Sequence, residues 1–442
     1  MSRFHDVRRW ARQNGLSCEE RQTGAGADPA RRTPQTWPAR GLAAFVHDRS
    51  GSGWRRARLG YPVRVTRIEL SAMGAVRPPA SAAVAAAARR EDQGFDAVWW
   101  ADHFLHWFPN SIWSPDLVAQ ASAQASPHVW FDPMPVIAAA AGVTSRITLG
   151  TGVTDVARRH PASLAQTALT LDHLSQGRFV LGIGTGEALN LAPYGIDNRR
   201  PLARLTEALT IIRALFASDE PLDFGGDFFQ LSGAQLGLRP FGERPPPIWV
   251  AAHRPKGLAL VGAMADGWLP LATDPTRYGE MLARVEAAAR DAGRPPGAVT
   301  PGVYARIVLA ERREDAERII DNSLLMRFIA LTRPAEAYEA HGVEHPLGSG
   351  VFGLTHFMPT SYGREDALAL AAKVPTPVVR ETVLYGTPDD IARDVARFVA
   401  VGARHVQLTN MTPMADPSNA AASDALLGDL VTEIRRREVA DA

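Results

Sequence analysis

From Val63 onward, short β-branched and apolar runs alternate with longer amphipathic stretches, and this alternation is the feature that most constrains the fold. The predicted strands cover residues 65–70, 97–100, 147–151, 179–183, 248–251, 267–271, 303–309 and 405–408. Helical patterns cover residues 81–93, 161–174, 202–216, 256–264, 277–291, 314–330, 388–401 and 419–437. Several of these helices begin at or near a proline, which suits the first turn because its missing N–H leaves no hydrogen bond unmade.

Strands that alternate with helices predict parallel pairing through right-handed crossovers. Eight such units favour an α/β fold of the (β/α)8 TIM-barrel type with insertions. A doubly wound open sheet is the alternative architecture. Two long segments interrupt the repeat. Residues 334–386 lie within the seventh unit, and residues 104–134 carry the apolar side chains Trp107, Phe108, Ile112, Trp113, Trp130 and Phe131.

Residues 1–62 differ in composition from the rest of the chain. Arginines are scattered there among Gly, Pro, Ser and Thr without apolar periodicity. This pattern predicts a disordered extension, or a segment that precedes the true start of translation, and assigns the folded domain to residues 63–442. The pair Arg8-Arg9 is followed by no apolar run, so an export signal is not expected.

Charge and cysteine content exclude several classes of protein. The formal net charge of +1 favours neither nucleic acid nor an anionic membrane as a partner. The single Cys18 excludes a disulfide framework and a cysteine-rich metal site. No apolar run reaches the roughly 20 residues that span a bilayer, so a soluble, cytoplasmic protein without an integral membrane segment is predicted.

Polar side chains follow four of the predicted strands directly. Asp102 and His103 follow residues 97–100, Thr154 follows 147–151, Glu187 follows 179–183, and His253 follows 248–251. Because the active sites of TIM barrels lie at the carboxyl ends of the strands, these groups are expected on one rim. An exposed helix start with Asp102 as the N-cap is the structural alternative for the first pair. The nearby Trp107 favours a flat conjugated ligand.

The segment "GIGTGE" resembles a dinucleotide-binding fingerprint but departs from it. Glu187 occupies the place of the third glycine, where a carboxylate would repel a pyrophosphate. We interpret Gly182, Gly184 and Gly186 as letting the backbone approach a ring while Glu187 faces the site. A tight turn with a solvated glutamate is the alternative.

Two further motifs predict no chemistry. The segment "HGVEH", residues 341–345, matches a zinc pattern, but Gly342 and Pro346 oppose the continuous helix that this pattern needs. No metal site is therefore expected. Gly225-Gly226, within residues 223–229, predicts the turn of a β-hairpin.

Three segments carry a family resemblance: "ADHFLHW" (101–107), "GTGVTDVARRHPA" (150–162) and "LGIGTGEALN" (181–190). They resemble the luciferase-like monooxygenase superfamily, in the branch that uses the deazaflavin coenzyme F420 and includes F420-dependent glucose-6-phosphate dehydrogenase. Residues 341–348, 371–375 and 386–390 resemble F420-dependent phthiodiolone ketoreductases. The resemblance extends from Val65 to the C-terminus. It implies a TIM barrel with the deazaflavin at its C-terminal mouth, and a homodimer.

The resemblance also implies roles for individual residues. His103 and Glu187 would be catalytic acid/base groups, and Trp107 would lie near the ring and shape the substrate site. A non-prolyl cis peptide is expected at Gly152-Val153, behind the ring. Asp102 would contact the ring system of the coenzyme, and Thr154 and Asn190 would also contact the coenzyme. Its phosphate would be bound by His253, Arg254, Lys256 and Gly257.

One departure from the dehydrogenase bears on the substrate. Asp274 stands where that enzyme has a phosphate-binding lysine, so glucose 6-phosphate is not expected. The aromatic segment 104–134 favours an apolar ligand, with a packed lid over the barrel as the alternative. The resemblance predicts hydride transfer between deazaflavin C5 and a carbonyl or alcohol carbon, most simply by a ketoreductase acting on a lipid-like ketone. An FMN-dependent monooxygenase and a barrel metallohydrolase are the competing functions.

Deleting residues 1–60 is expected to leave folding and activity intact, because the predicted domain begins after them. Circular dichroism and an activity assay of the truncated protein test this. A soluble truncated protein without activity would contradict it.

Overall fold

The structure, a computed structural model, describes residues 45–46, 55–56 and 67–440. Eight parallel strands form its centre: β3 (Glu69–Met73), β4 (Ala97–Trp100), β5 (Thr148–Thr151), β7 (Phe179–Gly184), β10 (Ile248–Val250), β11 (Gly267–Trp268), β12 (Thr300–Leu309) and β14 (His405–Asn410). Each pairs with its neighbour in this order, β14 pairs with β3, and the β7–β10 pairing completes the ring. Closure confirms the predicted TIM barrel and excludes the open sheet.

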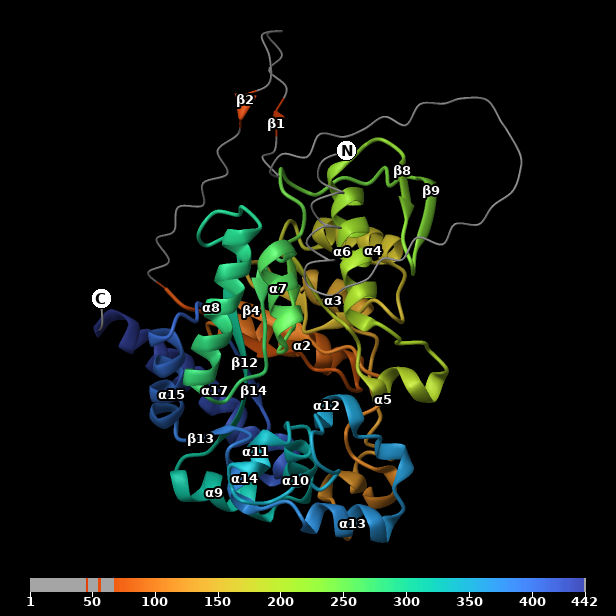
Figure 1. Ribbon diagram of the computed structural model, residues 1–442. Coiled ribbons are helices and arrows are strands. Elements are labelled where there is room, and N and C mark those ends of the chain that lie inside the picture. Colours follow the sequence, from red (N-terminus) through yellow and green to blue (C-terminus); the bar gives the residue numbers. More distant parts are fainter. Residues whose placement is uncertain (1–44, 47–54, 57–66, 441–442) are drawn as a thin grey trace, which may run out of the picture.

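Helices surround this barrel on its outer side (Figure 1). They are α2 (Ala80–Asp92), α3 (Pro133–Ala141), α4 (Pro161–Leu174), α6 (Pro201–Ala217), α7 (Pro255–Met264), α8 (Pro275–Asp291), α9 (Arg313–Asn322), α15 (Pro388–Ala400) and α17 (Ala420–Ala440). Except for α9, whose buried residues belong to a separate apolar cluster, their buried faces and the outward side chains of the strands form one large apolar core. A smaller cluster around Trp99 and Trp249, whose ring centroids are 5.1 Å apart, packs with inward side chains of the strands.

Several predicted elements differ in position from the structure. The first barrel strand was expected at residues 65–70, but β3 begins at Glu69. The helix expected over residues 314–330 is divided, because the Ser323 hydroxyl accepts a hydrogen bond from the Met326 N–H and begins a new helix, α10 (Leu324–Ala330). Helix α3 was not predicted, although Asp132 is a regular N-cap followed by proline. The short strands β6 (Thr154–Asp155) and β13 (Leu384–Gly386) were also missed.

Two predictions outside the barrel also have an outcome. The expected hairpin is present as the antiparallel strands β8 (Leu222–Gly225) and β9 (Gln230–Ala234). The interpretation of residues 1–62 lies outside the described residues, except for the paired strands β1 (Phe45–Val46) and β2 (Arg55–Arg56). No helix in the described part of the chain is both long enough and apolar enough to cross a membrane.

The two insertions pack together into a second apolar core. The first has only short 3-10 turns, at Asn110–Ile112 and Ala119–Ser122. The second holds α11 (Glu336–Glu339), α12 (Gly353–His356), α13 (Arg364–Ala372) and α14 (Thr376–Arg380), which lie below the barrel in Figure 1. Phe108 and Ile112 are fully buried in this core, so much of the aromatic segment is packing, as the lid alternative predicted. The remaining short helices are α5 (Ala188–Leu191) and α16 (Thr412–Ala415).

A buried carboxylate joins a surface helix to the start of a barrel strand. Glu91, near the end of α2, accepts hydrogen bonds from the backbone N–H groups of Ser145, Arg146 and Ile147. Burial opposes its ionisation, but these backbone donors outweigh burial and lower the pKa of Glu91 to about 2. The charged carboxylate thus fixes the turn that leads into β5.

Replacing Glu91 is expected to weaken the whole domain. Glu91→Ala leaves three backbone donors without their acceptor and should lower the free energy of unfolding by about 3 kcal/mol, measured by urea denaturation. Because the pKa of Glu91 is depressed on folding, its contribution is present above pH ~4.5 and is lost as the pH falls toward ~2. The exposed Glu339→Ala serves as control, with a change within about 0.5 kcal/mol. Equal stability of both variants at neutral pH would contradict this role.

Candidate active site at the carboxyl rim

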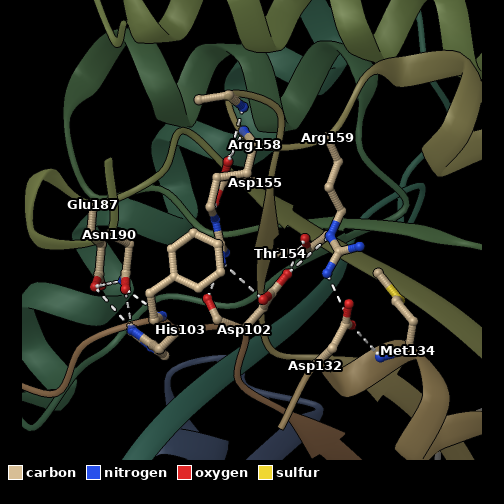
Figure 2. Close-up of polar contacts among 12 residues, drawn as sticks. Asp102, His103, Asp132, Met134, Thr154, Asp155, Arg158, Arg159, Glu187 and Asn190 are labelled. Carbon is tan, nitrogen blue, oxygen red and sulfur yellow. Dashed lines mark hydrogen bonds and ion pairs between the residues drawn. The ribbon is translucent and has the colours of Figure 1, made fainter. Parts of the chain in front are cut away.

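His103 and Glu187, the predicted acid/base pair, lie side by side at the carboxyl end of the barrel. His103 follows β4, and Glu187 follows β7 and begins helix α5. The Nδ1 atom of His103 is 3.6 Å from Oε2 of Glu187, and Figure 2 shows the two side chains converging with Asn190. Both side chains keep some solvent access, 12% for His103 and 29% for Glu187. The chain thus brings an imidazole and a carboxyl together on the rim.

Asn190 fixes the orientation of this pair. Its Oδ1 atom accepts hydrogen bonds from the backbone N–H groups of Phe104 (2.7 Å) and Leu105 (3.0 Å). The amide nitrogen therefore faces His103 and donates to Nδ1 at 2.7 Å, and it lies 3.4 Å from Oε2 of Glu187. Because Nδ1 is an acceptor, the neutral imidazole carries its proton on Nε2. His103 can then present that N–H as a donor.

Burial shifts the two partners in opposite directions. Desolvation, helped by the nearby Arg158, lowers the pKa of His103 to about 4. Desolvation also raises the pKa of Glu187 to about 7, against the opposing effect of Arg306. A histidine with its ordinary pKa of about 6.5 would exchange a proton near neutral pH. The structure instead keeps His103 neutral there, and Glu187 is the group of the pair that titrates near pH 7.

Asp102, expected to bind the ring system of a coenzyme, is already engaged by protein groups. The Thr154 hydroxyl donates to its Oδ2 atom at 2.6 Å, and Arg158 and Arg159 approach its carboxylate at 3.1 and 3.3 Å. Only 4% of the Asp102 side chain is exposed. Asp102 and Thr154 therefore lie at the site, where their mutual bond and two guanidinium groups hold the rim together (Figure 2). The two arginines were not singled out, although they follow Thr154 closely in the sequence.

The glycine-rich segments have mixed outcomes. A non-prolyl cis peptide is present at Gly152-Val153, as the family resemblance predicted. At Gly182 the structure gives a packing reason for the glycine, because an added Cβ would lie 1.8 Å from the Thr151 carbonyl oxygen of β5. Gly186 adopts a φ of +82° in the turn before Glu187. These glycines serve strand packing and a turn that delivers Glu187 to the site.

Two tryptophans line the site beside His103. The ring centroid of His103 is 5.2 Å from that of Trp107 and 4.9 Å from that of Trp130. The Nε1 atoms of both indoles are buried and have no hydrogen-bond partner among the described residues. Because buried donors are normally hydrogen-bonded, these two N–H groups beside His103 are available to acceptor atoms of a ligand.

The segment expected to bind phosphate, residues 253–257, has two roles in the structure: His253 contacts a neighbouring loop, and the remaining residues begin helix α7. Nε2 of His253 accepts a hydrogen bond from the Leu271 N–H at 3.0 Å, so this ring nitrogen positions the loop after β11. Arg254 and Lys256 are exposed at the start of α7, which has no side-chain cap. The N–H groups of Lys256 and Gly257 precede the first intrahelical bond, from Leu258 to Arg254. Free amides and two cations at a helix start suit an anion.

Arg306 was missed by the sequence analysis, because it lies in an otherwise regular strand pattern, β12. Only 3% of the residue is exposed. One guanidinium nitrogen donates to the Thr332 hydroxyl at 3.2 Å, and the guanidinium carbon is 5.5 Å from the ring centroid of Trp107. No carboxylate of the described residues forms an ion pair with it. A buried arginine within a strand that contains no acidic residue is the signal that was overlooked.

Both histidines of the zinc-like motif have partners other than each other. His341 pairs with Glu381 at 2.8 Å, and Nε2 of His345 lies 3.3 Å from the Leu331 carbonyl oxygen. Residues 341–345 are not helical, as Gly342 and Pro346 predicted. No group of three or more potential metal ligands occurs within residues 67–440.

Comparison with known proteins gives a consistent set of similarities. The family described as luciferase-like monooxygenase matches residues 63–405. The phthiodiolone/phenolphthiodiolone dimycocerosates ketoreductase of Mycobacterium tuberculosis is 38% identical over 338 residues, 75% of this chain and 88% of that protein. A 5,10-methylenetetrahydromethanopterin reductase of Archaeoglobus fulgidus is 27% identical, over 72% of this chain and 85% of its own. A structure of an F420-dependent secondary alcohol dehydrogenase with an F420-acetone adduct has a TM-score of 0.64 at 22% identity, covering 83% of this chain and 99% of that one.

Replacing the amide that orients His103 is expected to change the titration of the imidazole. In Asn190→Asp the negative carboxylate would accept a hydrogen bond from a protonated Nδ1–H and stabilise the imidazolium, so the pKa of His103 should rise well above its value of about 4. NMR of ¹⁵N-histidine-labelled protein measures this pKa and the tautomer. Asn110→Asp, at an exposed position, is the control. An identical His103 titration in wild type and Asn190→Asp would contradict the assigned hydrogen bond.

Proposed function

Since the chain belongs to the luciferase-like monooxygenase family, we propose that it is a coenzyme F420-dependent oxidoreductase. It would transfer a hydride between C5 of the deazaflavin and a carbonyl or alcohol carbon, as a ketoreductase on an apolar ketone. The observation that carries this proposal is the contact of neutral His103 with Glu187, whose pKa is raised to about 7. The relative named as a ketoreductase supports the ketone, and the similar solved structure named as F420-dependent supports the coenzyme.

The residues of the rim fit this coenzyme. The free amides and cations at the start of α7 suit its phosphate. The unpaired indole N–H of Trp130 suits a carbonyl oxygen of a conjugated ring. Thr154 and the cis peptide at Gly152-Val153 follow β5 at the carboxyl rim, where the ring system would be held. When bound, the deazaflavin supplies or accepts a hydride as one two-electron step.

The acid/base pair supplies the proton that accompanies the hydride. As a ketone is reduced, negative charge develops on its oxygen and a donor within about 3 Å is required. Protonated Glu187 gives up that proton, and a pKa of about 7 suits the task. Neutral His103 donates a hydrogen bond from Nε2 to the same oxygen and stabilises its charge. For alcohol oxidation, ionised Glu187 accepts the proton instead.

Activity is expected to depend on pH in opposite senses in the two directions. Ketone reduction requires protonated Glu187, so its rate should fall as the pH rises through about 7, and alcohol oxidation should rise over the same range. Glu187→Gln should abolish both dependences and lower turnover by roughly 10²–10⁴-fold. His103→Ala should lower turnover by a similar factor.

Initial rates in both directions, together with F420 binding measured by fluorescence, check these expectations. Binding of the coenzyme should persist in both variants. Near-normal turnover in Glu187→Gln and His103→Ala would overturn the assignment of the pair.

The competing FMN-dependent monooxygenase makes a different prediction for binding. Equilibrium titration with F420 and with FMN should give the tighter complex with F420, and oxygen consumption should stay at background. Tight FMN binding with oxygen-dependent turnover would favour the alternative. A homodimer and a cytoplasmic location belong to the same proposal and rest on the family resemblance, and sedimentation velocity tests the dimer.

A further inference from the structure

We propose that Arg306 and the indole N–H of Trp107 form a substrate subsite that binds a second oxygen atom of the ketone. The preferred substrate would then be an oxygenated ketone on an apolar skeleton, bearing a hydroxyl, ether or further carbonyl oxygen near the reacting carbonyl. A plain alkyl ketone would be the poorer substrate. This inference rests on the proposed ketoreductase function and specifies its substrate class.

The first argument is the hydrogen-bonding capacity of Arg306. A guanidinium has five N–H donors and no acceptor, and it stays charged at neutral pH. Its side-chain partners in the described part of the protein are the Thr332 hydroxyl, at 3.2 Å, and Tyr304. Two neutral hydroxyl groups leave most of its donors unpaired. Burying a cation whose N–H groups are unpaired costs free energy unless an oxygen acceptor forms hydrogen bonds with them.

The second argument concerns the charges around Arg306. The positive charge of Arg306 opposes the burial-driven rise in the pKa of Glu187, but the two side chains are too far apart to form an ion pair. The pKa of Glu187 is raised to about 7, so it is partly protonated at neutral pH and does not act as a permanent counter-ion. Asp102 is bound by Arg158 and Arg159. The positive charge of Arg306 is therefore available to a ligand.

The third argument is the position of Arg306 relative to the reacting groups. Its guanidinium lies over the Trp107 ring, at 5.5 Å from the centroid, and Trp107 lies 5.2 Å from the His103 ring. A ketone held by His103 and Glu187 would extend past Trp107 toward Arg306. The buried, unpartnered Nε1 of Trp107 adds a second donor along this path. Unpaired N–H donors of Arg306 and Trp107 beside an indole ring favour apolar molecules that carry oxygen atoms.

A matched pair of ketones tests the subsite. One is a medium-chain methyl ketone, and the other is the hydroxy ketone that differs by one hydroxyl group two carbons from the carbonyl. With reduced F420, wild-type kcat/KM should favour the hydroxy ketone by roughly 10–100-fold. In Arg306→Met this ratio should fall to about 1, whatever the absolute rates. Arg306→Lys keeps the charge but loses the planar fork, and should retain an intermediate ratio.

Two controls separate selectivity from folding. Arg327, a partly buried arginine of α10 that donates to the Val374 carbonyl, provides Arg327→Met, whose ratio should equal that of wild type. Thermal unfolding and F420 binding of each variant report on integrity. If Arg306→Met does not fold, Arg306→Lys and wild type still decide the question. Equal kcat/KM for both ketones in wild type, or an unchanged ratio in Arg306→Lys and Arg306→Met, would overturn the subsite.

Binding measurements distinguish the subsite from the proposed function. Calorimetric dissociation constants for the two ketones with the F420-loaded protein should show the same preference and its loss in Arg306→Met. A binding preference without turnover of either ketone would support the subsite and overturn the ketoreductase function. Turnover without any preference would leave the function standing and overturn the subsite.

Discussion

The hydrogen bond from the Asn190 amide to Nδ1 of His103 is the interaction on which the site depends. It joins the segment after β4 to the segment after β7, which are separated by β5 in the barrel. Because Oδ1 of Asn190 is held by two backbone N–H groups, the amide has a single orientation that satisfies its partners. That orientation sets the imidazole tautomer, points an N–H outward from Nε2, and keeps Glu187 within 3.6 Å.

Burial then gives the pair complementary states. Desolvation favours the neutral form of each group, so it lowers the pKa of His103 and raises that of Glu187. The arginines near them modulate this effect, since Arg158 and Arg306 disfavour a charged imidazole and favour a charged carboxylate. The result is a donor that stays neutral beside an acid that titrates near pH 7. This division of roles suits a reaction in which one oxygen gains charge and then a proton.

The sequence predicted the barrel well because alternating strand and helix patterns are local signals. Strand β4 was placed correctly, and His103 and Glu187 were placed on one rim from their positions after strands. What was missed depends on distant contacts. Arg306 is a regular strand residue in the sequence, and its meaning comes only from its burial beside Trp107. The pKa of His103 could not be read from its residue type, because desolvation in the folded chain determines it.

The insertions show the same limit. An aromatic-rich segment indicates either a ligand site or a core, and only packing decides between them. Phe108 and Ile112 enter a second core shared with the distant insertion, whereas Trp107 remains beside His103. Helix α3 begins at Asp132-Pro133, a normal start signal that lay at the edge of a segment regarded as irregular. Boundaries between regular and inserted segments are where sequence reasoning was least accurate.

Infrared difference spectroscopy of Glu187 tests the central claim most directly. Spectra of wild type and Glu187→Gln, compared from about pH 5 to about pH 9, isolate the carboxyl stretch of this one residue. The account predicts a protonated carboxyl band that is present at the acid end and disappears with a midpoint near the pKa of about 7. A midpoint near the ordinary glutamate pKa of about 4.3, with no protonated band at neutral pH, would contradict it.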